Sequence, residues 1–428
     1  MLKDRYSFNQ NALYLMAQDQ ELAPDKYPDA INLCTGTPGF LNPAYKTPNI
    51  LVPFTDAAYQ NLSTFSPEFT ENMRDYCADK IGHDIPQDNF LIGVSTFNYF
   101  RYLVDVLPEY QSGNVKNQKG STVVISPQGS YLLWNRIGGE MVKSDDDLSL
   151  METQYDSGYK ITAKDIEKWA QSRSENLQNR PTVLPLENPS IGGHVYSAEE
   201  LIDIHASCKE NGIFIFYDEV YRETCAPCVE FTSLPAVIDD MDNVLAVTTF
   251  SKGYGNLQLN LAGATGPSEV CELLYPHFKD EWRKTTTNHI KMVESIINDL
   301  NKEYLEHART LYADKVEAVA QKVEELGKTL TAPLKIPHLP QAGYSMFIDA
   351  TKAVTGQDSL DKKEGAALNK SLFEKFAQQG LVTQPLHASG IQDRLMVRLV
   401  FGNNDQKEIN KGLDVMSSVI RAYEAGMT

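Results

Sequence analysis

Residues 181–219 read PTVLPLENPSIGGHVYSAEELIDIHASCKENGIFIFYDE, and this stretch decides the fold of the 428-residue chain. It holds two short apolar runs, PTVLPL and IFIFY, separated by a segment with helix signals. Ser197 and Glu200 have the spacing of a capping box, and Gly212 is placed to end the helix. The stretch therefore predicts a strand, a helix and a second strand, in that order.

The same pattern continues on both sides of this unit from about residue 90. Four further apolar runs have the character of buried strands: FLIGV (90–94), STVVIS (121–126), NVLAVTTF (243–250) and LAGATG (261–266). Strands that are apolar throughout are typical of parallel sheets covered on both faces. We therefore expect an α/β protein with a mostly parallel central sheet flanked by helices.

A long charged stretch, residues 289–327, has apolar positions at helical spacing and is expected to link two domains. The remainder holds a few strands and helices, which predicts a smaller α+β domain at the C-terminus. We divide the chain into an N-terminal arm (1–45), a large domain (46–300) and a small domain (301–428). The arm is expected to pack on the small domain or on a partner subunit.

Composition excludes several classes of partner. Asp and Glu outnumber Lys and Arg by 57 to 39, so the chain would repel nucleic-acid phosphates. No apolar run approaches the roughly 20 residues of a membrane-spanning helix, and the N-terminus lacks the apolar core of a secretory signal. Cys225 and Cys228 form a CxxC, but no second pair completes a zinc site. We expect a cytoplasmic protein with reduced cysteines and no metal.

Polar residues follow three of the predicted strands at the point where each ends. Asn188 follows PTVLPLE, Asp218 follows IFIFY, and Ser251 with Lys252 follows NVLAVTTF. Open α/β sheets bind their ligands at the carboxyl ends of the strands. These side chains are therefore the first candidates for an active site.

The ordered set NPSIGGHVYS (188–197), YDEVY (217–221) and TFSKGYG (249–255) resembles the class I/II aminotransferases, which are pyridoxal-phosphate enzymes. The resemblance extends from INLCTGTPGF (31–40) to MVRLVFG (396–402), so it covers most of the chain. It implies the type I fold of these transferases, that of aspartate aminotransferase, and pyridoxal 5′-phosphate as cofactor. It also implies an amino acid and a 2-oxo acid as substrates, and a homodimer.

The resemblance assigns cofactor roles to the residues at the strand ends. Lys252 would form a Schiff base with pyridoxal phosphate and move the substrate's α-proton. Asp218 would keep the pyridine nitrogen protonated, so that the ring can accept electrons. Asn188 and Tyr221 would hydrogen-bond the ring hydroxyl, and the Ser251 hydroxyl would help to hold the phosphate.

Two further segments complete the expected cofactor site. Gly93 ends a strand and Ser95 with Thr96 opens the helix that follows, which is the usual geometry for binding phosphate through backbone N–H groups. An aromatic side chain from SPQGSYLLW would stack on the ring; Tyr131 and Trp134 both qualify, and we favour Tyr131.

The resemblance also implies how a substrate is held. Arg398 in MVRLVFG is similar to the family's clamp for the α-carboxylate, because a guanidinium can bind a carboxylate through two hydrogen bonds. Arg394, on the same face of the predicted strand, is the alternative. Gly36 matches the family's glycine that closes over the substrate, and Asn188 would contact the substrate as well.

The chain departs from the family's pattern at the phosphate end of the cofactor. Asn260 stands where the family usually has an arginine that grips the phosphate. Phe65 stands where a tyrosine often reaches the phosphate in the partner subunit. Losing the arginine should weaken cofactor binding by about one to two powers of ten, since a hydrogen bond to a charged group is worth about 1.5–3 kcal/mol.

Two other interpretations stay open beside amino-group transfer. The same scaffold serves other pyridoxal-phosphate reactions of amino acids, namely elimination, replacement, cyclisation, decarboxylation and oxidation, and a fold does not separate them. The other is a non-catalytic binding protein that has lost its grip on the phosphate. The joint presence of Lys252, Asp218, Asn188 and Tyr221 argues against it.

Overall fold

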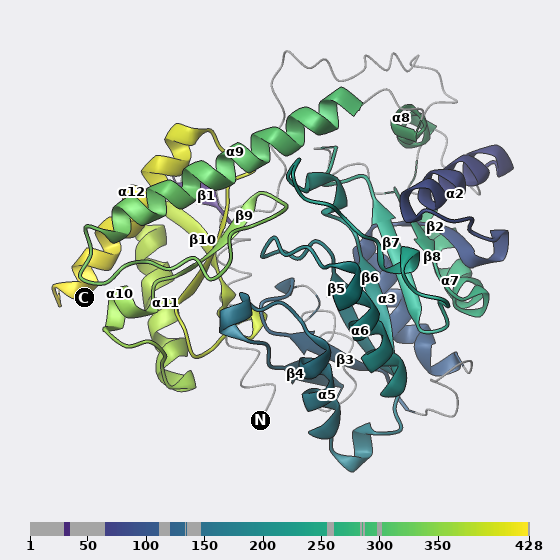
Figure 1. Cartoon of the computed structure of the whole chain (residues 1–428), viewed down its shortest axis with the longest axis horizontal. Coiled ribbons are helices and arrows are strands. Elements are labelled where there is room, and N and C mark those ends of the chain that lie inside the picture. The colour runs from purple at the N-terminus through teal and green to yellow at the C-terminus, as the bar shows by residue number, and fades with distance from the viewer. Residues whose placement is uncertain are drawn as a thin grey trace.

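The computed structural model describes residues 30–34, 65–110, 120–132, 134, 147–254, 261–282, 285, 287–297 and 302–426. These residues form two sheets, each covered by helices, with the long helix α9 (Lys302–Gly327) running from one to the other (Figure 1). Tyr304 near the start of α9 donates a hydrogen bond to the Tyr254 carbonyl beside the larger sheet. Further along α9, Tyr312 and Val319 pack in the core of the smaller one.

The larger sheet has seven strands in the order β2-β8-β7-β6-β5-β3-β4. Their bounds are β2 Phe90–Val94, β3 Val123–Pro127, β4 Leu148–Met151, β5 Thr182–Glu187, β6 Ile213–Asp218, β7 Val244–Thr249 and β8 Leu261–Thr265. β8 is antiparallel to both of its neighbours, and the remaining ladders are parallel. The predicted mostly parallel sheet is confirmed.

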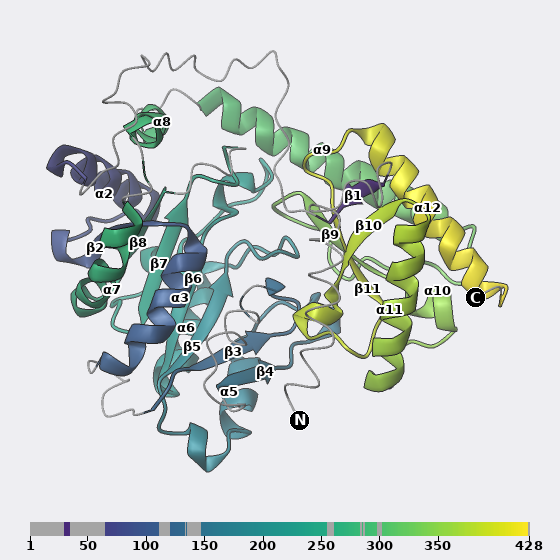
Figure 2. The ribbon, with the colours of Figure 1, turned by 180° about the vertical axis from the view of Figure 1, so that it is seen from behind.

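β6 shows why these strands are apolar throughout. Phe214 and Phe216 point to one face and pack in the cluster that includes α3 (Thr96–Val106). Ile215 and Tyr217 point to the other face and pack against α6 (Ala198–Glu210). Alternate residues of a strand face opposite sides, so a strand covered on both faces is apolar up to its end. Figures 1 and 2 show α6 and α3 on opposite faces of the sheet.

The helix signals in the deciding stretch are confirmed. Ser197 caps the start of α6, with its side chain accepting from the backbone N–H of Glu200 and the Glu200 side chain accepting from the backbone N–H of Ser197. Gly212 follows the end of α6 with φ of 66°, in the left-handed region that glycine adopts readily. The other helices around this sheet are α2 Pro67–Ile81, α5 Ala163–Gln171, α7 Ser268–Glu281 and α8 Thr287–Ile297.

The smaller sheet has four strands in the order β1-β10-β11-β9. Their bounds are β1 Ile31–Leu33, β9 Ser345–Asp349, β10 Leu381–Pro385 and β11 Met396–Val400, and the helices beside them are α10 Thr351–Thr355, α11 Lys362–Gln378 and α12 Gln406–Glu424. This confirms the smaller α+β unit. β1 belongs to the predicted N-terminal arm and pairs with β10. The boundaries predicted near residues 45 and 300 stay predictions.

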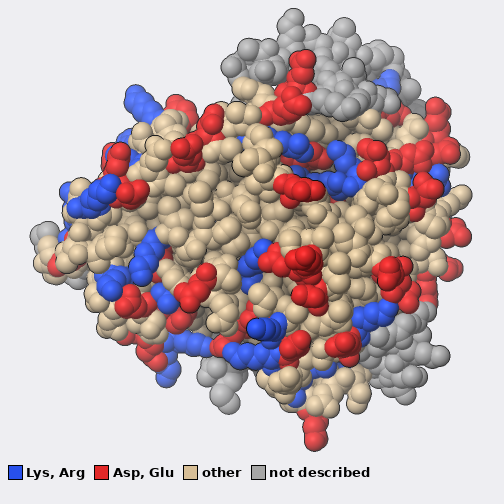
Figure 3. All heavy atoms as spheres, viewed as in Figure 1, with Lys and Arg blue, Asp and Glu red and all other residues tan. Residues whose placement is uncertain are grey.

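On the face shown in Figure 3, Lys and Arg side chains are interspersed with Asp and Glu. Within the described ranges, no helix is both long and apolar enough to cross a membrane. Searching the same ranges finds no group of three or more His, Cys, Asp or Glu that could hold a metal ion. All six cysteines lie in these ranges and none of them forms a disulfide; Cys225 is buried whereas Cys228 is exposed.

Candidate active site

The candidate site lies at the carboxyl edge of the larger sheet, because neighbouring strands are aligned there. Glu187 at the end of β5 stands opposite Asp218 at the end of β6, and Asp218 stands opposite Val247 in β7. Lys252 follows the end of β7, and its positive charge acts on the Asp218 carboxyl. The structure therefore brings Asp218 and Lys252 to one edge, as the sequence predicts.

Asp218 is a buried carboxyl group with no ion-pair partner among the residues that the structure describes. Its Oδ1 accepts a hydrogen bond of 2.9 Å from the backbone N–H of Val220. Burial, reinforced by the negative charge of Glu187, raises the pKa of Asp218 to about 8, although Lys252 acts in the opposite direction. A protonated ring nitrogen would supply the missing positive partner, so this carboxyl fits a pyridine cofactor.

Glu187 is a site residue that the sequence reasoning missed. Its Oε1 accepts hydrogen bonds from Tyr131 N and from Trp134 Nε1, each 2.7 Å long, and its Oε2 accepts one of 3.0 Å from Ile191 N. Burial raises the pKa of Glu187, and these three donors oppose the shift. A carboxylate at the end of an apolar strand, directly before Asn188, was the only signal in the sequence.

Glu187 fixes the segment that holds both candidate aromatic residues. Trp134 is buried and packs edge-on against Phe100 and Phe216, within the core of the larger sheet. Tyr131 is partly exposed, and it is close enough to Asp218 and Arg398 for their charges to act on its hydroxyl. Burial is the main reason that the pKa of Tyr131 is raised. Tyr131 therefore borders the site, whereas Trp134 supports it.

Asn188 is fully buried at the cis Asn188–Pro189 peptide, and its side chain is held by the protein itself. The amide nitrogen donates to Tyr217 Oη at 2.7 Å and to the Thr232 carbonyl at 3.0 Å, and the amide oxygen accepts from Tyr196 N at 3.2 Å. A hydrogen bond to a cofactor hydroxyl would replace one of these contacts. The cofactor and substrate roles of Asn188 stay predictions.

Arg398 reaches the site from β11 of the smaller sheet and is 2 % exposed. Its Nη2 lies 3.4 Å from Tyr221 Oη, so it meets the segment that follows β6. Its Nε donates to Ser345 Oγ at 3.3 Å and its Nη1 donates to Gln384 Oε1 at 3.1 Å. All three partners are neutral, and no carboxylate of a described residue forms an ion pair with Arg398.

Arg394, the alternative clamp, is engaged elsewhere. Its Nη1 forms an ion pair of 3.2 Å with Asp349 Oδ2 and donates to the Asp358 carbonyl at 2.6 Å. Its guanidinium also lies over the Tyr155 ring, 3.7 Å from the ring centre. A guanidinium with a carboxylate partner already in place is a structural group, so Arg398 is the better candidate for an anion.

The segments expected to bind the cofactor phosphate follow β2 and β7, the two strands on either side of β8. Gly93 in β2 and Thr249 in β7 both stand opposite Ala262 of β8, so Ser95 and Ser251 lie just beyond the ends of the two strands that flank β8. Ser95 caps α3, accepting from Asn98 N at 3.3 Å, and has φ of 61°, a left-handed conformation that is uncommon outside glycine.

Thr96 is the first residue of α3, and a helix start leaves backbone N–H groups available to an anion. Ser251 is held by Thr249, whose Oγ1 accepts from Ser251 N at 3.1 Å. The structure places none of Gly36, Asn260 and Phe65 at this end of the site. Gly36 and Asn260 lie outside the described residues. Phe65 packs in the core, with ring centres 5.1 Å from Trp282 and 5.4 Å from Phe69.

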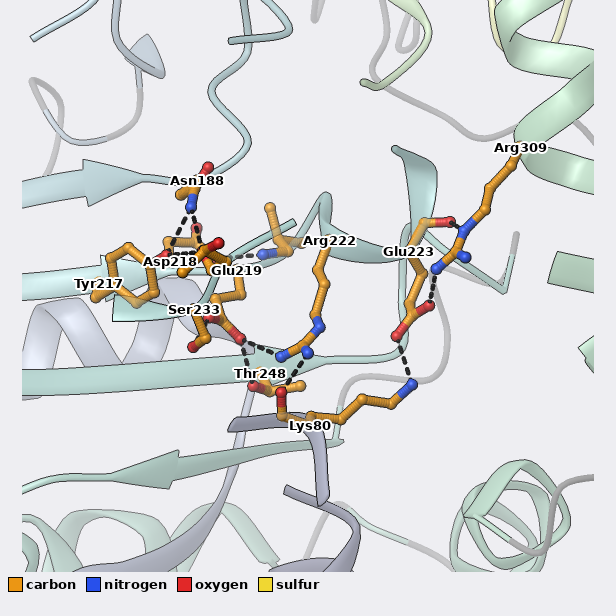
Figure 4. A network of polar contacts seen from close by, with 12 residues as sticks. Lys80, Asn188, Tyr217, Asp218, Glu219, Arg222, Glu223, Ser233, Thr248 and Arg309 are labelled. Atoms are coloured by element: carbon orange, nitrogen blue, oxygen red, sulfur yellow. Dashed lines mark hydrogen bonds and ion pairs between the residues drawn. The ribbon is translucent and has the colours of Figure 1, made fainter. Parts of the chain in front are cut away.

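Two acidic residues that follow Asp218, Glu219 and Glu223, hold the segment after β6 in place through polar contacts (Figure 4). Glu219 is buried, pairs with Arg222 at 3.1 Å and accepts from the hydroxyls of Ser233 and Thr248. The Arg222 guanidinium also donates to the backbone carbonyl of Lys80 in α2. This network fixes the segment that carries Asp218 and Tyr221.

Glu223 extends the network to the long helix. It pairs with Lys80 Nζ at 2.9 Å and with Arg309 Nη2 of α9 at 2.6 Å. Burial opposes ionisation of Glu223, but the two cations outweigh it and lower its pKa. The segment after β6 is therefore tied both to α2 and to the helix that leads into the smaller unit.

The two sheets and their aligned strand ends have the fold of aspartate aminotransferase. The sequence profile of the family described as aminotransferase class I and II matches residues 145–416. The chain belongs to this family. The predicted family and the predicted fold class are both confirmed.

Comparison with named relatives gives low identities. The chain is 23% identical over 216 residues to the histidinol-phosphate aminotransferase of Caldicellulosiruptor saccharolyticus, covering 50% of this chain and 51% of the relative. It is 25% identical over 179 residues to the probable aspartate/prephenate aminotransferase of Aquifex aeolicus, covering 40% of this chain and 42% of the relative. The chain spans about half the length of the curated relatives it matches.

Solved structures match along nearly the whole chain. The aspartate aminotransferase of Rhizobium meliloti superposes with a TM-score of 0.69 at 14% identity, covering 95% of this chain and 96% of that chain. The aromatic aminotransferase of Pyrococcus horikoshii OT3 superposes with a TM-score of 0.71 at 14% identity, covering 95% and 99%. These similarities show the fold.

Proposed function

We propose that the chain is a pyridoxal-phosphate-dependent aminotransferase, which moves an amino group between an amino acid and a 2-oxo acid. One contact carries the proposal: Arg398 Nη2 lies 3.4 Å from Tyr221 Oη. It joins a buried guanidinium from the smaller sheet to the edge that holds Asp218 and Lys252. An anion-binding group beside an amine and a buried carboxyl suits an amino-acid substrate and a pyridine cofactor.

Bound pyridoxal phosphate would supply a ring that accepts the electrons left on the substrate's α-carbon when its proton departs. Asp218 would pair with the protonated ring nitrogen, which explains why a carboxyl with a pKa of about 8 is kept in a buried position. The start of α3, with Ser95 and Thr96, would bind the phosphate, and the Ser251 hydroxyl would add a donor. Tyr131 would cover one face of the ring.

Lys252 would hold the cofactor through its ε-amino group and, once released by the incoming substrate, would move the proton at the substrate's α-carbon. Tyr221 and Asn188 would orient the ring through its hydroxyl. Arg398 would bind the substrate's α-carboxylate, since its charge has no carboxylate partner among the described residues. Gly36 would close over the substrate, and the active unit would be a homodimer in the cytoplasm.

A second candidate is another pyridoxal-phosphate reaction of an amino acid, from the group of elimination, replacement, cyclisation, decarboxylation and oxidation. Asn260 favours keeping it, because this chain lacks the arginine with which the family usually grips the phosphate. The two candidates share the residues that would bind the cofactor and the substrate's α-carboxylate. They differ in whether a 2-oxo acid restores the starting form of the cofactor.

Absorbance spectroscopy of the purified protein tests the proposal. Added pyridoxal phosphate should give a band typical of a lysine-bound cofactor; an amino acid should convert it to the amine form, and a 2-oxo acid should restore it. Lys252→Ala should abolish the band, whereas Lys328→Ala, at an exposed position directly after α9, should not. A protein that forms no band, or keeps it after Lys252→Ala, would refute the proposal. Conversion that a 2-oxo acid does not reverse would favour the second candidate.

A further inference from the structure

Gln384 in β10 and Arg398 in β11 lie directly opposite each other on neighbouring strands of the smaller sheet. They are a cross-strand pair in the antiparallel ladder between β10 and β11, and both are buried, with 6 % and 2 % of their surfaces exposed. Arg398 Nη1 donates to Gln384 Oε1 at 3.1 Å. The two side chains therefore form one unit rather than two independent groups.

Chemistry fixes the orientation of the Gln384 amide. A guanidinium has only donors, so the amide oxygen must face it and the amide nitrogen must carry the remaining contacts. That nitrogen bears two N–H groups, and it is buried with no hydrogen-bond partner anywhere in the described ranges. Buried donors are nearly always paired in folded proteins, so these N–H groups need an acceptor that the described protein does not supply.

The charge beside Gln384 identifies the acceptor. Arg398 is a buried cation whose described partners are the neutral oxygens of Ser345, Gln384 and Tyr221. Buried cations are normally balanced by an anion. A carboxylate offers one negative charge and up to four acceptor positions, which matches a guanidinium with unused N–H groups next to a free primary amide.

We infer that Gln384 binds the substrate directly, donating from Nε2 to the α-carboxylate that Arg398 also holds. Gln384 thus has two tasks: its oxygen orients the guanidinium, and its nitrogen adds a neutral donor to the same anion. The inference rests on the proposed function and deepens it. It gives the site a donor set for the head group that an amino acid and its 2-oxo acid share.

Carboxylate binding without turnover tests this inference on the protein carrying its cofactor. The probes are three unreactive acids with a common head group and different tails: propionate, 4-methylpentanoate and 3-phenylpropionate. Dissociation constants are measured by calorimetry for the wild type, Gln384→Leu and Gln384→Glu. The second variant keeps an oxygen for Arg398 but replaces both N–H groups with a negative charge beside the guanidinium. Gln406→Glu, on the exposed first turn of α12, makes the same chemical change far from the sheet.

Both Gln384 variants should weaken all three probes by about tenfold or more, and by a similar factor for each, while Gln406→Glu should not change them. Melting temperatures and cofactor spectra show that the variants are folded. Wild-type affinity in either Gln384 variant would overturn the inference. An effect on only one probe would place Gln384 at the substrate's tail and would overturn it as well.

A double variant separates binding from mere support of Arg398. If Gln384 only positions the guanidinium, adding Gln384→Leu to Arg398→Lys should have no further effect, and that result would overturn the inference. Direct binding predicts a further loss of several-fold. These outcomes are distinct from failure of the proposed function. The wild type can exchange amino groups as proposed even if the Gln384→Leu variant binds the probes with unchanged affinity, and that combination would refute only the role of Gln384.

Discussion

Asp218→Asn should make the cofactor-free protein more stable at neutral and alkaline pH. In the folded protein burial and the neighbouring Glu187 raise the pKa of Asp218 to about 8, whereas an unfolded chain would have an ordinary value near 3.9. Between these two values the folded state keeps a proton that the unfolded state releases. The free energy of unfolding therefore falls as the pH rises from about 4 to about 8.

The size of the effect follows from the pKa difference. Each pKa unit corresponds to about 1.4 kcal/mol, so the full penalty is on the order of 5 kcal/mol, and about 4 kcal/mol of it develops between pH 5 and pH 8. Asparagine resembles the protonated acid in shape and carries no charge at any of these pH values. The variant should therefore lack this part of the pH dependence.

Urea unfolding of the cofactor-free protein at pH 5 and pH 8 measures the difference. With an m-value of about 3 kcal/mol/M or more for a chain of this size, the wild-type midpoint should fall by up to roughly 1 M relative to the variant. Asp84→Asn, which removes the same charge from an exposed position, should behave like the wild type. Equal midpoint changes in Asp218→Asn and the wild type would refute the reasoning.

Glu187→Gln should lower the free energy of unfolding by about 1–3 kcal/mol. The glutamine amide has only one oxygen, so its NH2 group must face at least one of the three N–H groups that donate to the Glu187 carboxylate. An unchanged urea midpoint would contradict this. Burial lowers the pKa of His194 to about 3. The free energy of unfolding should therefore decrease as the pH falls below about 6.5, because there only the unfolded chain gains the proton. Thermal unfolding against pH should show a flatter acid limb in His194→Gln. Arg309→Met should cost about 1–3 kcal/mol by leaving Glu223 with Lys80 alone, and calorimetry that finds no loss would exclude this role.

The sequence predicted the strands of the larger sheet well where they are buried on both faces. β6 has apolar residues on both sides, and its run of five is visible without any alignment. β4, with the sequence LSLM, was missed because it is an edge strand whose first residues are only partly buried. The antiparallel direction of β8 could not be predicted, since an apolar run looks the same in both directions.

Site residues could be predicted only where their place along the chain, such as the end of a predicted strand, matches the order that the family has. Asp218 ends one strand, Lys252 follows another, and their order matches the family, so both could be named from the sequence. Glu187 and Gln384 were missed, because each stands out only once the residue opposite it in the sheet is known: Asp218 for Glu187 and Arg398 for Gln384. That pairing depends on strand order and register, which a single sequence does not determine.

The two halves of the site each hold a buried ionisable side chain without a close counterion among the described residues: Asp218 at the edge of the larger sheet, which stays protonated below about pH 8, and Arg398 in the smaller one. A site with only a structural role would have paired them, because isolated buried charges lower stability. Here the loss can be recovered only when ligands balance both charges, so binding and stability are linked. A ligand at one hundred times its dissociation constant would add about 2.7 kcal/mol to the free energy of unfolding. Asp218→Asn should raise the stability of the empty protein and remove much of this gain, which makes the penalty at Asp218 a consequence of function.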